Sequence, residues 1–325
     1  MPREPVALGC FAMGTRFEVV LFGDNAPNLR AAGEEVLEEV SRLEAVLSIY
    51  RPGSEMSRVN AEAAERPVTV SPPLFALLER CAELTRRTEG AFDISVGPLL
   101  RCWGFLGGSG ALADPSEVEA ARALVGMEKV LLDPEELTVA FERPGMMLDL
   151  GSIGKGYALE QAGQLLLGSG ITTALLHGGT STVLAFGAPP DAQEWTIGLQ
   201  DPAEPEGRLG LARLRDNSLS VSGVHGKGFE AGGQRYGHVL DPRTGWPVRP
   251  MVPGEGEPRV AAVVTHSATD ADALSTALLV HGPAWLPRLV EDWPGSRGLV
   301  GSWVGEGRPL VLASLRWDGD APAHG

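Results

Sequence analysis

Residues 146–167 read MMLDLGSIGKGYALEQAGQLLL, and they predict a short strand, a glycine-rich turn and a helix in direct succession. The apolar strand covers 146–150, the turn covers 151–156, and the helix runs to Leu167. Glycines in such a turn let backbone N–H groups approach a ligand, and the helix N-terminus suits phosphate oxygens. The spacing matches neither a Walker loop nor a dinucleotide fingerprint. The stretch therefore predicts either an anion-binding site or a purely structural turn.

The segments on either side of this stretch differ in character. On the N-terminal side, a strand at 16–22 precedes amphipathic helices at 29–47 and from Pro73 onward. On the C-terminal side a helix at 270–280 interrupts a series of strands, expected at 173–176, 195–199, 209–214, 219–222, 236–240, 260–265, 299–304 and 310–315. This order predicts an α+β fold with mixed sheets and flanking helices. We expect an N-terminal extension over 1–10, one domain over 11–316 and a flexible tail over 317–325.

The composition is that of a soluble globular protein with an acidic surface. The net charge of −15 over 325 residues argues against a nucleic-acid partner and against an anionic membrane surface. A phosphate-bearing ligand then needs local help from a metal, a helix N-terminus or a few placed cations. Three scattered cysteines, with no CxxC pair, argue against a zinc site or a disulfide framework. With no signal peptide or membrane segment in view, we expect a cytoplasmic protein, or a periplasmic or membrane-anchored one if a leader was removed.

The segment SATDADALSTALLVHG, residues 267–282, carries the strongest metal-binding pattern. Asp272 and Thr276 are four residues apart, so they share one face of a helix. A carboxylate and a hydroxyl are hard oxygen ligands of the kind that Mg²⁺ prefers. The alternative is structural: Asp270 caps the helix, Asp272 complements its dipole, and Thr276 packs.

Two further segments carry candidate site residues. In GGQRYGHVLDPRTGWPV, residues 232–248, His238 ends a strand just before a tight turn. It serves there either as a base or ligand-binding group, or as a structural histidine. In GAFDISVGPLLRCWGF, residues 90–105, aromatic and turn residues wall a planar ligand or belong to the core.

Together these segments resemble the FAD:protein FMN transferase family, the ApbE-type flavinyltransferases. The motifs that carry the resemblance occur in sequence order from residue 11 to about 282: FAMGTRF (11–17), LSIYRPGSEMSRVN (47–60), GAFDISVGPLLRCWGF (90–105), LDLGSIGKGYALE (148–160), LLHGGTSTVLAFG (175–187), HVLDPRTGWPV (238–248) and ATDADALSTAL (268–278). Their conjunction is far more specific than any one of them.

The resemblance implies two interleaved subdomains around a cleft that holds FAD. It implies Mg²⁺ held by the side chains of Asp272 and Thr276 and by a loop carbonyl, that of Ser152 or alternatively Gly154. The positions that match the FAD-lining residues of the family are Met13, Tyr50, Ala91, Phe92, Asp93, Asp149, Lys155, His238 and Val239. We expect the rings of Tyr50 and Phe92 to contribute surface to that site.

The implied activity is the Mg²⁺-dependent transfer of FMN from FAD to a Thr or Ser hydroxyl of an acceptor flavoprotein, with release of AMP. Asp272 and His238 are the expected catalytic residues. FAD and the acceptor are the expected partners, without nucleic acid and without membrane insertion. The alternatives are an FAD pyrophosphatase, in which water replaces the hydroxyl, and an FAD-binding protein without turnover.

The chain departs from the family pattern at three places. Thr180 follows Gly178–Gly179, where relatives usually carry Asn or Asp. Residues 224–227 replace a frequent aromatic–arginine pair, and Glu160 closes the KGYAxD motif. The first two departures keep the non-catalytic alternative open.

Overall fold

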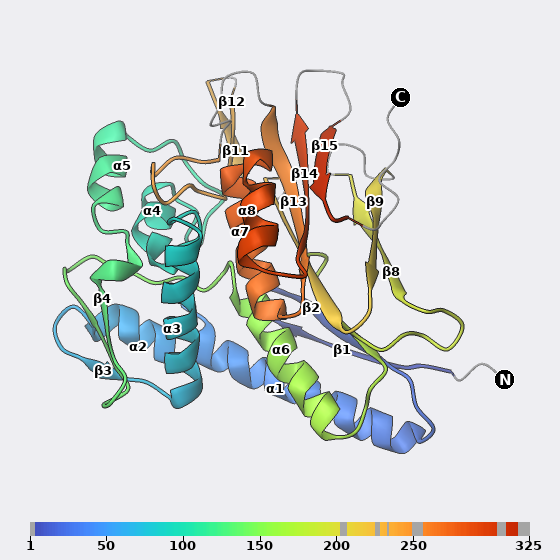
Figure 1. Ribbon diagram of the computed structural model, residues 1–325. Coiled ribbons are helices and arrows are strands. Elements are labelled where there is room, and N and C mark those ends of the chain that lie inside the picture. Colours follow the sequence, from blue (N-terminus) through green and yellow to red (C-terminus); the bar gives the residue numbers. More distant parts are fainter. Residues whose placement is uncertain are drawn as a thin grey trace. The chain divides into compact units, whose positions relative to one another are not determined.

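The computed structural model describes residues 4–201, 207–224, 228–232, 234–248, 256–303 and 310–317. The chain divides into two compact units. Unit 1 comprises residues 1–44, 153–222 and 250–325, and unit 2 comprises 45–152 and 223–249. Unit 2 thus consists of two insertions into unit 1, and each unit contains helices and sheets (Figure 1). The α+β class with two interleaved subdomains is confirmed.

Within its described residues, unit 1 is built on an eight-stranded sheet of order β1-β2-β6-β7-β10-β13-β14-β15. The strands are β1 (Val6–Ala12), β2 (Thr15–Leu21), β6 (Ala174–Gly178), β7 (Thr182–Phe186), β10 (Asn217–Gly223), β13 (Glu257–Thr265), β14 (Arg297–Trp303) and β15 (Val311–Leu315). The neighbours whose register is described pair antiparallel. Strands β8 (Trp195–Gln200) and β9 (Arg208–Leu214) form a separate antiparallel pair.

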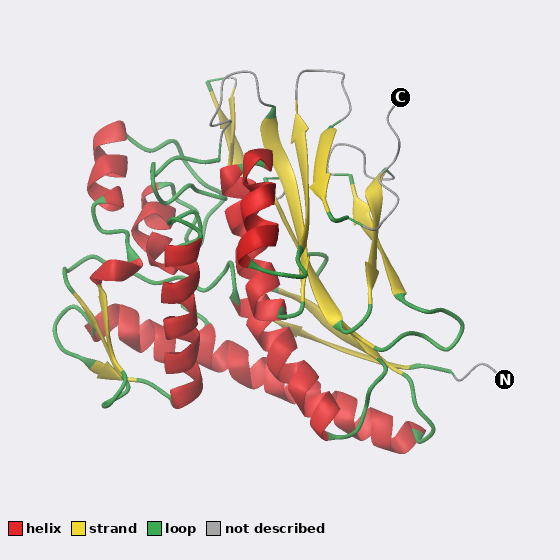
Figure 2. Cartoon of the chain, viewed as in Figure 1, coloured by secondary structure: helices red, strands yellow, loops and turns green. Residues whose placement is uncertain are grey.

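The sheet of unit 1 is covered by helices and by the β8–β9 pair. The helices are α1 (Ala26–Leu47, whose last residues belong to unit 2), α6 (Gly154–Gly168), α7 (Ala268–His281) and α8 (Leu286–Asp292). Helix α7 packs against β13 and α6, and α6 packs against β6 and β7 (Figure 2). Val260, Ala262 and Val264 of β13 join the apolar cluster that contains Trp195 and Leu214 of the β8–β9 pair. Because strand side chains alternate in direction, β13 is buried on both faces.

Unit 2 combines helices with small sheets. Its elements are α2 (Glu55–Glu62), α3 (Pro72–Arg87), α4 (Gly97–Cys102), α5 (Pro115–Arg122), the sheet β3 (Val68–Thr69)–β5 (Thr138–Phe141)–β4 (Val130–Asp133), and the hairpin of β11 (Gly228–Ala231) and β12 (Gln234–Gly237). Trp103 stacks on Tyr236, and its Nε1 donates to the Gly245 carbonyl at 2.9 Å. These contacts join the two inserted segments into one core.

The expected strand at 146–150 is wrong. The N–H of Leu148 donates to Asn60 Oδ1 at 2.8 Å, and its carbonyl accepts from Asn60 Nδ2 at 2.9 Å. The N–H of Asp149 donates to the Ile94 carbonyl at 2.7 Å. A side chain and a loop therefore satisfy the backbone groups that a neighbouring strand would otherwise pair.

Two expected boundaries also need correction. Residues 6–10, assigned to an extension, lie in β1 and pair with β2 at the edge of the sheet. Trp317, assigned to the flexible tail, packs against the cluster of the β8–β9 pair, and its Nε1 donates to the Leu211 carbonyl at 3.0 Å. Residues 318–325 lie outside the described part. Of the helices that are described, none has the length and apolar character needed to cross a membrane.

Candidate active site

Asp272 lies in the first half of α7, in unit 1, and is buried with 3% exposure. The helix begins at Ala268 because Ser267 caps it, with Oγ accepting from the N–H of Asp270 at 3.1 Å. Glu160 of α6 completes the cap, since its Oε2 accepts from Ser267 Oγ at 2.6 Å and from the N–H of Thr269 at 2.8 Å. The departure from the family motif at Glu160 thus keeps a carboxylate where the helix needs an acceptor.

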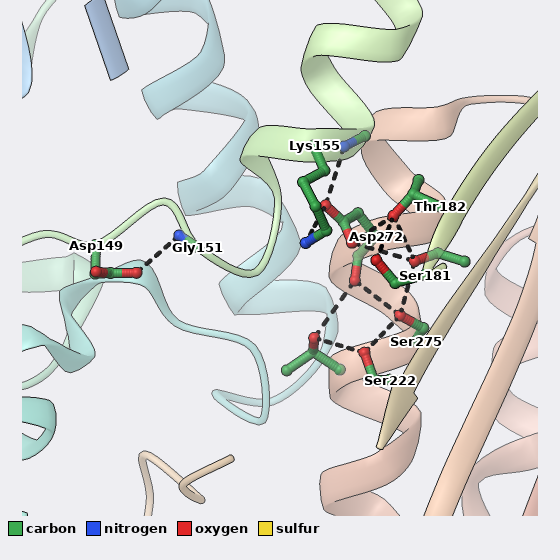
Figure 3. A network of polar contacts seen from close by, with 11 residues as sticks. Asp149, Gly151, Lys155, Ser181, Thr182, Ser222, Asp272 and Ser275 are labelled. Carbon is green, nitrogen blue, oxygen red and sulfur yellow. Dashed lines mark hydrogen bonds and ion pairs between the residues drawn. The ribbon is translucent and has the colours of Figure 1, made fainter. Parts of the chain in front are cut away.

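The carboxylate of Asp272 is fixed by donors from three elements (Figure 3). Oδ2 accepts from the N–H of Gly156 in α6 at 3.0 Å. Oδ1 accepts from Ser220 Oγ of β10 at 3.1 Å and from Thr182 Oγ1 of β7 at 3.3 Å. All three donors are neutral, so they orient the carboxylate without neutralising its charge.

Lys155 brings a positive charge to this carboxylate. Its Nζ lies 3.8 Å from Asp272 Oδ2, and its side chain is 23% exposed. The adjacent Gly156 allows α6 to approach α7, because a Cβ there would lie 2.1 Å from the Ala268 carbonyl oxygen and 2.8 Å from Asp272 Cβ. The glycine therefore serves close helix packing, and its amide binds a carboxylate of the protein itself.

A row of hydroxyl groups continues from Asp272 along α7 and β10. Ser275 Oγ lies 3.3 Å from Ser220 Oγ and 2.8 Å from Ser222 Oγ. Ser222 Oγ lies 3.1 Å from Thr276 Oγ1, which also donates to the Asp272 carbonyl at 3.4 Å. Asp272 and Thr276 therefore share one helix face, as expected, within a set of oxygen atoms.

In unit 2 the expected loop begins with Asp149, whose Oδ1 accepts from the N–H of Gly151 at 2.7 Å. Two amides of the glycine turn, those of Gly151 and Gly156, are thus bound to carboxylates of the chain. Amides bound in this way are not available to an anion. Ser152 is the last residue of unit 2 before Ile153, where unit 1 resumes.

The other expected residues of unit 2 differ in exposure. Tyr50 is 63% exposed, and partial burial followed by the charge of Asp149 raises the pKa of its phenol. Ala91 and Phe92 are buried, each with 1% exposure. The ring of Phe92 is therefore a core ring, whereas that of Tyr50 is open to contact.

Asp93 is buried in unit 2 and caps the short 3-10 helix that follows it. Its Oδ1 accepts from the N–H and the hydroxyl of Ser95 at 2.8 and 2.6 Å, and its Oδ2 accepts from the N–H of Met127 at 3.1 Å. Burial raises the pKa of this carboxyl, although these hydrogen bonds oppose the shift. Its contacts within the protein are therefore structural.

His238 directly follows β12 and is half-buried, as is Val239, whose carbonyl accepts from the N–H of Val248 at 3.0 Å. The predicted tight turn at 241–245 is present, with the N–H of Gly245 donating to the Asp241 carbonyl at 2.8 Å.

In unit 1, Met13 occupies the β1–β2 turn with φ 50°, which is rare for a residue with a side chain. The residues from His225 to Lys227 lie outside the described part.

Comparisons with known proteins relate this chain to one family. Residues 13–299 match the ApbE family. The chain is 32% identical over 252 residues to an FAD:protein FMN transferase of Klebsiella pneumoniae (strain 342), with 76% of this chain and 75% of the relative covered. It is 32% identical over 284 residues to an FAD:protein FMN transferase of Treponema pallidum (strain Nichols), with 83% and 76% covered. The crystal structure of the ApbE protein of Thermotoga maritima superposes with a TM-score of 0.83 at 29% identity, covering 95% of this chain and 97% of that one.

The chain belongs to the ApbE family. It is accordingly a transferase. The donor set around Asp272 suits the divalent cation expected from the resemblance, because a carboxylate and the hydroxyls of Thr276 and Ser222 are hard oxygen ligands. The ammonium of Lys155 shows that this place accepts a positive charge.

Three residues of this candidate site were not expected as site residues: Thr182, Ser220 and Ser222. Ser218, Ser220 and Ser222 alternate along β10, and alternate residues of a strand point to one face. This pattern was a usable signal for a polar face. Thr182 belongs to β7, which the sequence analysis did not predict.

Proposed function

We propose that this protein splits FAD and transfers its FMN half to a Ser or Thr hydroxyl of an acceptor protein, with Mg²⁺ bound and AMP released. The relatives named above as FAD:protein FMN transferases support the transfer. The observation that carries the metal requirement is the buried Asp272 carboxylate, held by three neutral donors and facing an ammonium.

The binding roles follow from the chemistry of the side chains. Asp272 and Thr276 hold Mg²⁺, with the Ser152 carbonyl as the third proposed ligand on the resemblance alone. When bound, Mg²⁺ supplies charge neutralisation and polarises phosphoryl oxygens. Thr182, Ser220 and the Gly156 amide keep the Asp272 carboxylate in one orientation. Lys155 supplies a positive charge for the pyrophosphate.

The reaction exchanges one phosphorus–oxygen bond for another. The acceptor hydroxyl oxygen bonds to the FMN-side phosphorus, and the bond from that phosphorus to the bridging oxygen breaks. AMP leaves with the bridging oxygen, and the hydroxyl proton passes to His238, our proposed base. Tyr50, whose ring is exposed, contributes a stacking surface for FAD.

The test is incubation of the protein with FAD, Mg²⁺ and candidate acceptors, followed by in-gel flavin fluorescence, intact-mass analysis and AMP quantification. We expect FMN on the acceptor and an equal amount of AMP. Asp272→Asn should lower the transfer rate by about 100-fold or more. Thr276→Ala should raise the half-saturating Mg²⁺ concentration by about tenfold, because water replaces a neutral ligand.

A matched control is Asp292→Asn, which removes a carboxylate of the same unit that pairs with Arg288 at 2.6 Å on α8. Its transfer rate should equal that of the wild type. Free FMN and AMP without labelled acceptor would instead indicate a pyrophosphatase, and unchanged FAD a binding protein. Wild-type activity in Asp272→Asn would place the metal elsewhere.

A further inference from the structure

Lys155 and Asp272 form an ion pair whose geometry differs from that of the neighbouring contacts. The Nζ–Oδ2 distance of 3.8 Å is too long for a hydrogen bond, whereas Gly156, Ser220 and Thr182 contact the same carboxylate at 3.0 to 3.3 Å. The carboxylate is therefore oriented by its neutral donors. Lys155 contributes charge without fixing the geometry.

The side chains of Lys155 and Asp272 differ in exposure. Asp272 is buried and bound from three elements, while the Lys155 side chain is 23% exposed on a flexible four-carbon stem. The backbone beside Lys155 is fixed, because the amide of Gly156 is bound to the Asp272 carboxylate. The ammonium thus lies near Oδ2, at the end of a stem with several rotatable bonds.

We propose that Lys155 is a built-in competitor of the divalent cation, occupying the counter-ion position at Asp272 whenever the metal is absent. This inference rests on the proposed metal site. A divalent ion bound to Asp272 and the ammonium near Oδ2 repel each other at this range, so Lys155 has to turn away as the ion binds. Displacing Lys155 costs free energy, which offsets part of the favourable interaction between the divalent ion and Asp272. Metal binding to the free enzyme is weaker as a result.

The displaced ammonium has a use in the proposed reaction. A lysine released from Asp272 can turn toward anionic oxygens, such as those of a diphosphate. The side chain then alternates between an internal carboxylate and an external anion. A purely structural ion pair would instead keep Lys155 at Asp272 in all states.

The test is direct Mn²⁺ binding to the metal-free full-length protein without FAD, with free Mn²⁺ measured by electron paramagnetic resonance. Lys155→Met removes the charge and keeps an apolar stem of similar length. We expect its Kd for Mn²⁺ to be about fivefold lower than that of the wild type. Lys155→Arg keeps the charge, so its Kd should stay within about twofold of the wild-type value.

Two controls separate the ion pair from general charge effects. Lys129→Met removes another lysine, whose Nζ donates to the carbonyls of Ala123 and Val125 in unit 2. It should leave the Kd unchanged. In an Asp272→Asn background, Lys155→Met should have no effect on Mn²⁺ binding, because the carboxylate for which the two cations compete is gone.

Thermal unfolding gives a second readout. In Lys155→Met, Asp272 lacks its counter-ion, so Tm should fall without metal, and saturating Mn²⁺ should raise it more than in the wild type. A lower Tm with an unchanged Kd would show a structural ion pair and overturn the proposal. The metal site itself, and this inference with it, would be overturned by either of two results. In the first, Asp272→Asn binds Mn²⁺ as the wild type does; in the second, neither the wild type nor any variant binds Mn²⁺.

Discussion

Tyr50 and Phe92 belong to the same unit but face different surroundings. Tyr50 is 63% exposed, while Phe92 is 1% exposed. An exposed ring offers a stacking surface to a planar ligand, whereas a buried ring contributes packing energy to the fold. The two aromatic positions of the proposed FAD site should therefore respond to different measurements.

Tyr50→Ala should weaken FAD binding by about fivefold, because a stacked ring contributes about 1 kcal/mol beyond its buried area. Its Tm should stay close to that of the wild type, since little of the ring is buried. Phe92→Ala should lower the unfolding free energy by about 3–5 kcal/mol. Fluorescence titration with FAD and thermal denaturation measure the two effects. Unchanged FAD affinity in Tyr50→Ala would remove this residue from the site.

Asp93 should make stability depend on pH in a direction opposite to that of most carboxylates. Burial raises the pKa of Asp93 in the folded protein, so its protonated form is favoured there. The contribution of Asp93 to the stability of the fold is fully present below the pKa that this carboxyl has in the unfolded chain. It is lost as the pH rises through the higher pKa of the folded protein. The difference in Tm between the wild type and Asp93→Asn (wild type minus variant) should therefore become larger as the pH is lowered from about 7 to about 4. A constant or decreasing difference would contradict this.

Asp272 shows what a sequence pattern can and cannot predict for a single residue. Its spacing from Thr276 predicts a shared helix face, which the structure has. Its burial is not visible in the sequence, because Gly156, Thr182 and Ser220 are 52 to 116 residues away along the chain. Replacing Asp272 by alanine leaves buried donors without acceptors, which costs about 1–3 kcal/mol each. Asp272→Asn keeps an acceptor oxygen for these donors, so it is a better test of the site than the alanine variant.

At the scale of elements, the contact between α6 and α7 depends on one residue without a side chain. Gly156 lets the first turn of α6 touch the backbone of α7 at Ala268, where a Cβ would overlap the carbonyl oxygen. The same approach brings the Gly156 amide to Asp272. Packing and site geometry are therefore set by a single contact.

Gly156→Ala should lower the unfolding free energy by about 3 kcal/mol and the Tm by about 6–12 °C, because the helices have to separate. Gly168→Ala, at the other end of α6, has no neighbouring atom within 4 Å and should change stability by less than about 1 kcal/mol. Thermal unfolding followed by circular dichroism compares the two. Equal Tm values for both variants would show that the α6–α7 contact is not as tight as the structure has it.

Among the elements, the sequence predicts long amphipathic helices better than short apolar segments. Helices α1 and α3 are close to their expected ranges, because their apolar stripes extend over several turns. The segment 146–150 fails because its apolar residues are typical of a strand while its backbone binds Asn60 and Ile94. Tertiary partners of this kind leave no periodic signal.

At the scale of the whole molecule, the α+β class follows from the order of predicted elements, whereas the division into two units does not. Composition does not change at residues 44, 152, 222 or 249, where the chain passes between the units. The sequence predicted the interleaving only through the family resemblance. Periodicity alone assigned a single domain, because it reports local structure and carries no information on which distant segments pack together.

The pairing of β2 with β6 has a consequence for synthesis on the ribosome. Leu21 lies beside Ala174, so the β1–β2 hairpin emerges about 150 residues before its partner strand exists. At typical translation rates of about 5–20 residues per second, the hairpin waits on the order of ten to thirty seconds with an open edge. During that interval the first insertion of unit 2 is made in full. The nascent chain is therefore most exposed to wrong pairing, and most in need of a chaperone, at its N-terminal hairpin.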